Sequence, residues 1–237
     1  MTTHAFDLLS KHETSMRRLS IHWAWLGGGY VLAFALPFLL ADRLELNRDA
    51  FYGVYAIAVV GLLGLWGRST GQHLGGAIRQ RWRWAMGLGV ACAGVPGLMV
   101  VRTESATPRP DGSELVAAVL WRGILYGVTD GLLLSVFPIL VVFAAFAGSG
   151  LRHRLSGTIA VGALALLASL AMTVVYHAGY SDFRSSKLSK PVSGDVVWSV
   201  PTLVTLNPLG APIAHAGMHV SAVLHSYETD TFLPPHE

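Results

Sequence analysis

Long apolar blocks separated by short polar segments dominate this chain of 237 residues. After a polar lead over residues 1–20, apolar stretches follow at about 23–41, 51–66, 84–101, 114–148, 156–176 and 196–225. They lack the strict alternation of apolar and polar residues that marks a half-buried strand. A helix needs about 20 apolar residues to cross the hydrocarbon core of a bilayer, and several blocks reach that length. The pattern predicts an all-α, polytopic transmembrane helical bundle.

Two irregular blocks leave the number of spans at six or seven. The block 114–148 is too long for one comfortable crossing at a rise of about 1.5 Å per residue. Asp130 and Gly131 near its middle predict a division there into two spans. The block 196–225 contains three prolines, which predict a broken or re-entrant last span rather than a straight helix. We favour seven spans, because the acidic tail then faces outward.

The same pattern divides the chain into three parts. Residues 1–20 form a polar N-terminal segment, residues 21–225 a transmembrane domain, and residues 226–237 an acidic tail. Arg17, Arg18 and the four arginines between 68 and 83 place the N-terminus in the cytoplasm by the positive-inside rule. We expect an integral protein of a bacterial cytoplasmic (inner) membrane.

Composition supports this class and excludes others. Only 13% of residues are charged and 52% are hydrophobic, whereas soluble domains carry about 25% charged residues. The net charge of +3 is spread over short loops, so we expect the lipid bilayer and no nucleic acid as a partner. Cys92 is the only cysteine, which excludes an intrachain disulfide and a multi-cysteine metal site.

Histidines near the ends of the last two blocks form the first candidate site. His215 and His219 are four positions apart, so a helix presents both imidazoles on one face, as for a pair of metal ligands. His177 ends the preceding block, and three imidazoles suit zinc with an open position for water. His225 lies about 120° off that face. The alternatives are interfacial histidines that bond carbonyls and headgroups, or axial ligation of haem, for which His22 is also available.

A second group of polar residues occupies the long block. Arg122, Tyr126 and Asp130 step by four and form one polar stripe, and Glu114 lies earlier in the same block. Arg122 lies mid-span, where an unpaired guanidinium is costly, so we expect it to have a partner. The pattern is compatible with an Arg–Asp or Arg–carbonyl lock between helices, and with a group that positions a substrate near the histidines.

Three short segments resemble the signatures of one membrane family, in the right order over about residues 114–225. The run LWRGILYG at 120–127 resembles the first motif of the CAAX-protease and bacteriocin-processing (CPBP) family of intramembrane metalloproteases. His177 resembles the histidine of the second motif. The run GAPIAHAGMH at 210–219 resembles the third, in which a polar residue follows a histidine by four positions.

The resemblance implies roles for particular residues, and departures from it. The glutamate pair of the family is replaced by Ala117 and Ala118, and the phenylalanine of its second motif by Thr173. Arg122 and His177 are 55 positions apart, wider than the usual interval of the family. By analogy, Glu114 would be the general base and Arg122 would stabilise the site. The three histidines, His177, His215 and His219, would hold zinc or position a water molecule.

Three interpretations follow. The first is a divergent CPBP-like protein acting on a membrane-protein or peptide substrate, as a metal-dependent intramembrane protease or an inactive relative of one. The second is a non-enzymatic membrane component, such as an accessory or assembly subunit with a partner protein, or a small-solute carrier. The third is a haem-binding membrane redox protein.

Overall fold

The computed structural model describes residues 3–184 and 186–234. Side chains before residue 19, within the predicted polar segment 1–20, lie outside that description, as does the end of the acidic tail. The described residues form helices and their connections, without a strand. The prediction of an all-α bundle is confirmed.

Among the residues that the structure describes, five helical segments are long and apolar enough to cross a membrane. Four of them centre on α1 (Thr3–Leu36, extended by the π-helical η1, Pro37–Arg43), α2 (Arg48–Thr70), α4 (Trp82–Thr103) and α8 (Leu155–Ala178). The fifth, here called the central helix, comprises α5 (Gly112–Ala118), η2 (Val119–Leu125), α6 (Tyr126–Asp130), η3 (Gly131–Val136) and α7 (Phe137–Ala145). Shorter helices are α3 (Leu74–Arg79), η4 (Gly150–His153), η5 (Ser181–Phe183), η6 (Ser186–Leu188) and η7 (Asp230–Phe232).

Local sequence sets the bounds of α2. Its N-cap is Asn47, whose side-chain oxygen accepts a hydrogen bond from the Ala50 amide at 3.0 Å. At the other end, Gly71 adopts a left-handed conformation with φ 70°, which glycine reaches at little steric cost. The helix therefore starts and stops where its capping residues occur.

The central helix is continuous, so the predicted division at Asp130-Gly131 is wrong. Residues 112–145 remain helical throughout, with π-helical segments on either side of Tyr126–Asp130. Asp130 does not end the helix, because its carboxylate is buried and bonded by side chains from α2 and from the last helix. π-helical turns inside α-helices often occur at functional sites, and these two flank Asp130.

The last predicted span is broken, as its prolines indicate. It consists of α9 (Ser189–Thr205) and α10 (Gly210–His225), joined by a turn in which Leu206 has a φ of 54°. With 17 and 16 residues, both helices are shorter than the roughly 20 residues of a full crossing. Six or seven spans are therefore not confirmed.

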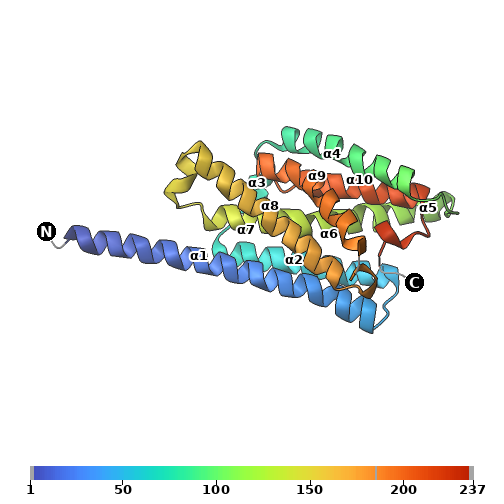
Figure 1. Cartoon of the computed structure of the whole chain (residues 1–237), viewed down its shortest axis with the longest axis horizontal. Helices are drawn as coiled ribbons and strands as arrows, with labels where there is room; N and C mark the ends of the chain where they lie inside the picture. The colour runs from blue at the N-terminus through green and yellow to red at the C-terminus, as the bar shows by residue number, and fades with distance from the viewer. Residues whose placement is uncertain (1–2, 185, 235–237) are drawn as a thin grey trace.

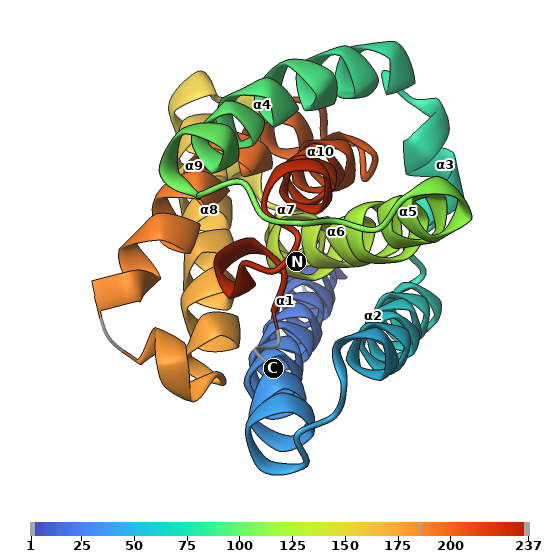
Figure 2. The same cartoon turned by 90° about the vertical axis from the view of Figure 1, so that its right-hand side faces the viewer.

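The helix α10 lies inside the bundle, enclosed by α4, α9 and the central helix (Figure 2). On its other side, the central helix contacts α1 and α2 (Figure 1). A stripe of glycines on the central helix, Gly123, Gly127 and Gly131, permits the close contact with α10.

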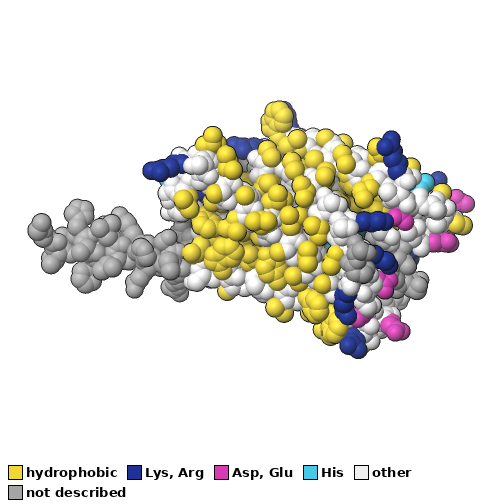
Figure 3. Space-filling view, viewed as in Figure 1, with side chains coloured by type: hydrophobic (Ala, Val, Ile, Leu, Met, Phe, Trp, Pro, Cys, Tyr) yellow, Lys and Arg dark blue, Asp and Glu magenta, His cyan; other side chains and the backbone are white. Residues whose placement is uncertain are grey.

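Exposed apolar side chains cover the middle of the molecule, and charged ones gather toward its ends (Figure 3). This surface fits an integral membrane protein.

Candidate metal centre

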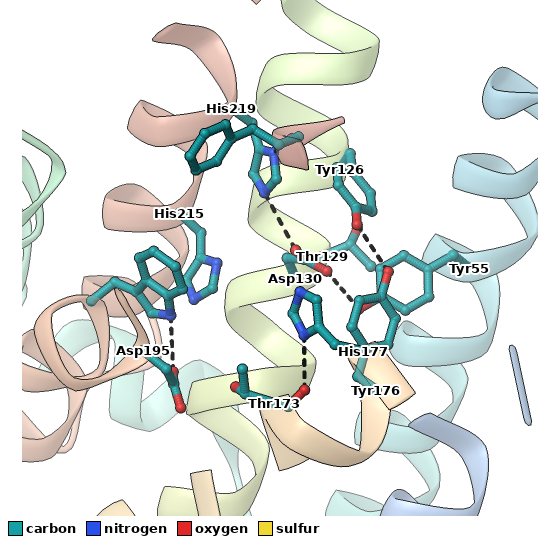
Figure 4. Close-up of polar contacts among 12 residues, drawn as sticks. Tyr55, Tyr126, Thr129, Asp130, Thr173, Tyr176, His177, Asp195, His215 and His219 are labelled. Atoms are coloured by element: carbon teal, nitrogen blue, oxygen red, sulfur yellow. Dashed lines mark hydrogen bonds and ion pairs between the residues drawn. The ribbon is translucent and has the colours of Figure 1, made fainter. Parts of the chain in front are cut away.

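Three buried side chains from two helices meet inside the bundle. Asp130 comes from the last turn of α6, and His215 and His219 come from one face of α10 (Figure 4). One potential ligand atom from each lies within 4.8 Å of the other two, and the three residues are at most 4% exposed. The predicted pairing of the two α10 histidines at a spacing of four is thus combined with a carboxylate from the central helix.

The orientation of His219 is fixed from the C-terminal tail. Its Nδ1 lies 2.7 Å from the backbone carbonyl of Phe232, and a carbonyl only accepts, so Nδ1 donates. The other nitrogen, Nε2, faces Asp130 Oδ2 at 3.3 Å. In the neutral ring Nε2 carries a lone pair, so two electron-rich atoms face each other and require a cation between them, either a proton or a metal ion.

Asp130 itself is held from a third helix. The hydroxyl of Tyr55 on α2 donates to Asp130 Oδ1 at 2.8 Å, in a fully buried contact. Bonds from a second shell of residues to the carboxylate and to the far nitrogen of a histidine are the usual way in which proteins orient metal ligands. Asp130 and His219 both have such bonds.

His215 contributes an atom without a hydrogen-bond partner. Its Nε2 lies 3.4 Å from the hydroxyl of Ser135. Its Nδ1 is buried and has no hydrogen-bond partner among the described residues. Most buried polar atoms are bonded, and an orphaned one calls for an explanation such as an ion. A cation bound with Asp130 and His219 would provide one.

His177 completes the ring of polar groups from α8. Its Nδ1 lies 2.8 Å from the carbonyl of Thr173, one helical turn earlier, so Nδ1 donates there. The other ring nitrogen points toward Asp130 (Figure 4). His177 lines the same cavity as the three clustered residues, with a volume of about 40 Å³. Since a water molecule needs roughly 10–15 Å³ by this measure, the cavity accommodates about three waters, or an ion with a water ligand.

The donor set fits zinc. Two imidazoles and one carboxylate are ligands of catalytic zinc sites, with bonds of about 2.0–2.2 Å. In a tetrahedral site such bonds place neighbouring ligand atoms about 3.3–3.5 Å apart. The Asp130–His219 pair, at 3.3 Å, already has that separation. The remaining separations, within 4.8 Å, require a side-chain adjustment of about 1 Å or slightly more.

The structure does not bring the other two predicted site residues to this cluster. Arg122 forms a bidentate ion pair with Asp49 of α2, at 2.8 and 2.7 Å, and its guanidinium lies over the ring of Tyr227. This arrangement matches the Arg–Asp lock between helices that the sequence left open, and Asp49 is the partner. Glu114 is exposed and lies sixteen residues before Asp130, about 24 Å along the helix.

The other histidines have separate partners. His22 Nδ1 accepts a hydrogen bond from the indole of Trp66 at 3.2 Å, and His225 contacts the carbonyl of Glu104 at 3.1 Å. The cavity beside His177 and His215 is about 40 Å³, whereas pockets for larger ligands have about 300–1,000 Å³. It has no room for a haem between these two histidines.

Sequence reasoning missed a chain of tyrosines beside Asp130. Tyr55 is one member. The hydroxyl of Tyr176 lies 2.9 Å from that of Tyr126 and 2.9 Å from that of Tyr180. Burial raises the pKa of Tyr180 well above its ordinary value, so its hydroxyl stays protonated. The sequence spacing marked Tyr126 alone, in the stripe with Arg122 and Asp130, and no spacing marked Tyr55, Tyr176 or Tyr180.

A buried acid, Asp195 on α9, was also missed. It is fully buried and lies behind His215, to which Ser135 connects it. Here a signal was present in the sequence, because an ionisable residue in an apolar helix invites a functional explanation.

No family model, no curated protein and no solved structure matches this chain. The resemblance to the CPBP family therefore rests on the short sequence motifs alone.

Proposed function

We propose that this protein is a zinc-dependent membrane hydrolase, a divergent CPBP-like protein, with Asp130, His215 and His219 as metal ligands. The observation that carries the proposal is the pair of facing acceptors, Asp130 Oδ2 and His219 Nε2, beside the orphaned Nδ1 of His215. These two facing atoms are 3.3 Å apart, which is already about the separation of neighbouring ligand atoms in a tetrahedral zinc site. Bound zinc would supply a Lewis acid at the floor of a small cavity.

The residues of the chain supply the remaining parts of a hydrolytic site. Tyr55 holds the Asp130 carboxylate, and Phe232 holds the ring of His219. His177 has Nδ1 bonded to a carbonyl and turns its other nitrogen into the cavity. There it would take a proton from water as the water oxygen bonds to the substrate carbonyl carbon. It would return that proton to the leaving amine as the C–N bond breaks.

The peptide bond as substrate follows from the CPBP resemblance, and this assignment replaces the roles expected for Glu114 and Arg122. Asp130 lies among the histidines, whereas Glu114 and Arg122 lie toward the exposed end of the central helix.

We further propose a bacterial inner-membrane location with a cytoplasmic N-terminus, which the arginines before the first and third spans support.

Elemental analysis of the detergent-purified protein tests the metal. We expect about one zinc per chain in the wild type, and its loss in the Asp130→Asn and His215→Ala variants. His225→Ala is the matched control, since His225 lies on α10 outside the cluster and bonds the Glu104 carbonyl. If the wild type contains no metal even after incubation with zinc, a proton bridges Asp130 and His219 and the proposal is wrong.

A protease assay then tests the reaction. Fluorescein-labelled casein in detergent is a general substrate, and we expect slow cleavage that His177→Ala abolishes without loss of zinc.

One observation favours a second candidate, a non-enzymatic membrane component with a structural metal. The cavity of about 40 Å³ is partly closed by the tail residues Thr231, Phe232 and Pro234. Bound zinc with no cleavage of casein or of membrane-extracted proteins would support that candidate.

A further inference from the structure

The carboxylate of Asp195 is bonded within the bundle, although it touches none of the clustered residues directly. Its Oδ1 accepts hydrogen bonds from Ser135 at 3.0 Å, Trp198 at 2.9 Å and Ser199 at 2.8 Å, and its Oδ2 accepts one from Ser169 at 2.9 Å. All five side chains are at most 4% exposed. They come from three elements, η3, α8 and α9, behind His215.

The direction of these hydrogen bonds determines whether Ser135 donates or accepts in its contact with His215. A hydroxyl has one proton, and Ser135 donates it to Asp195 Oδ1, while the neighbouring Ser199 hydroxyl lies on the donor side of its contact with Ser135. The proton of Ser135 therefore points at Asp195, and only lone pairs remain for the contact with His215 Nε2 at 3.4 Å. An acceptor at that position requires the proton of His215 to be on Nε2.

The consequence appears on the other side of the ring. A neutral imidazole with its proton on Nε2 carries a lone pair on Nδ1. Nδ1 is the atom of His215 that is buried without a hydrogen-bond partner in the described part of the chain. The polar network around Asp195 thus assigns the lone pair of His215 to the nitrogen that lacks a hydrogen-bond partner.

We propose that Asp195 is a positioning residue, which acts through Ser135 to hold His215 as the Nε2–H tautomer and to present Nδ1 to the metal. The inference rests on the proposed metal site and adds a residue that supports it. It also predicts mixed coordination, with His219 binding through Nε2 and His215 through Nδ1.

Substitutions separate this role from simple packing. In Asp195→Asn the amide accepts fewer hydrogen bonds and donates its own, so the Ser135 hydroxyl is free to donate to His215 Nε2 and move the ring proton to Nδ1. Ser135→Ala removes the contact outright. Ser169→Ala is the matched control, because Ser169 is equally buried and bonds the same carboxylate without a bond to Ser135 or His215, whereas Ser199 also contacts Ser135 at 2.9 Å.

Two measurements on the full-length protein in detergent test the inference. The first is ¹⁵N NMR of the histidine side chains after removal of metal, with the His215 signals assigned through His215→Ala. We expect the Nε2–H tautomer in the wild type and Ser169→Ala, and a shift toward Nδ1–H in Asp195→Asn and Ser135→Ala. The same tautomer in all four proteins, or Nδ1–H in the wild type, would overturn it.

The second measurement is zinc affinity by competition with a chromogenic chelator. We expect Asp195→Asn and Ser135→Ala to bind zinc about 10- to 100-fold more weakly, the usual effect of losing a residue that orients a metal ligand. Ser169→Ala should stay within about threefold of the wild type. Zinc binding by Ser135→Ala as tight as that of Ser169→Ala refutes the positioning role. Absence of zinc from the wild type instead refutes the metal site, and the NMR experiment still decides the tautomer.

Discussion

Gly127 lies at a tight contact between the central helix and α10, and its replacement by alanine is a direct test of the site geometry. A Cβ at this position would lie 2.6 Å from Ala216 Cα, 2.8 Å from Ala216 N and 3.0 Å from His219 Cδ2. Favourable contacts between carbon atoms are about 3.5–4.0 Å. Two of the three atoms belong to backbone, so a rotamer change cannot relieve the overlap. The helices must separate by about 1 Å.

That displacement affects zinc binding more than folding. Metal sites require ligand distances within about 0.2 Å of their ideal values, and the shift would separate His219 from Asp130 by several times that amount. We expect zinc affinity to fall at least about tenfold in Gly127→Ala. Overpacking costs about 1–3 kcal/mol, which lowers Tm by about 2–12 °C in a chain of this size.

The assay pairs zinc competition with thermal unfolding in detergent, followed through tryptophan fluorescence. Gly61→Ala is the control, since no other atom lies within 4 Å of its added Cβ and alanine favours the helix by up to about 1 kcal/mol. Its zinc affinity should be unchanged and its Tm equal or higher. If Gly127→Ala binds zinc as tightly as Gly61→Ala, close helix packing does not set the metal site.

Three further predictions use other contacts of the site. Truncation after Ser226 removes the Phe232 carbonyl, which orients His219, and should weaken zinc binding about tenfold in the chelator competition. Unchanged zinc affinity would show that the tail only covers the site. Tyr55→Phe removes the hydrogen bond to Asp130 and should lower zinc affinity about tenfold. Equal affinity would show that Tyr55 does not orient Asp130 for the metal. Arg122→Gln breaks a partly exposed ion pair with Asp49 and should lower the free energy of unfolding by at most about 1 kcal/mol. The variant should keep its full zinc content, and loss of zinc would instead place this arginine in the metal site.

Several features of the fold were predictable because they depend on local sequence. Apolar runs of about 20 residues indicate membrane helices wherever they occur. The break in the last block follows from prolines that cannot continue a helix freely, and the structure has a turn there between α9 and α10. The histidines at 215 and 219 share a face because helical periodicity alone dictates it.

Other expectations failed where a residue's surroundings override its local preference. Asp130 and Gly131 indicated a division of the long block, since charge and glycine both disfavour a buried helix interior. In the structure, Tyr55 donates a hydrogen bond to the carboxylate, His219 faces it at 3.3 Å, and the backbone of α10 packs against Gly131. The helix therefore continues through both residues.

The sequence by itself determined the all-α class, the apolar surface and the pairing of His215 with His219, because each depends on periodicity within one segment. Only the tertiary structure decided that Asp130 joins those histidines, that Arg122 pairs with Asp49, and that Glu114 remains outside. These outcomes depend on which helices become neighbours, and neighbours are set by packing of side chains far apart in the chain. A list of ionisable residues carries no such distances.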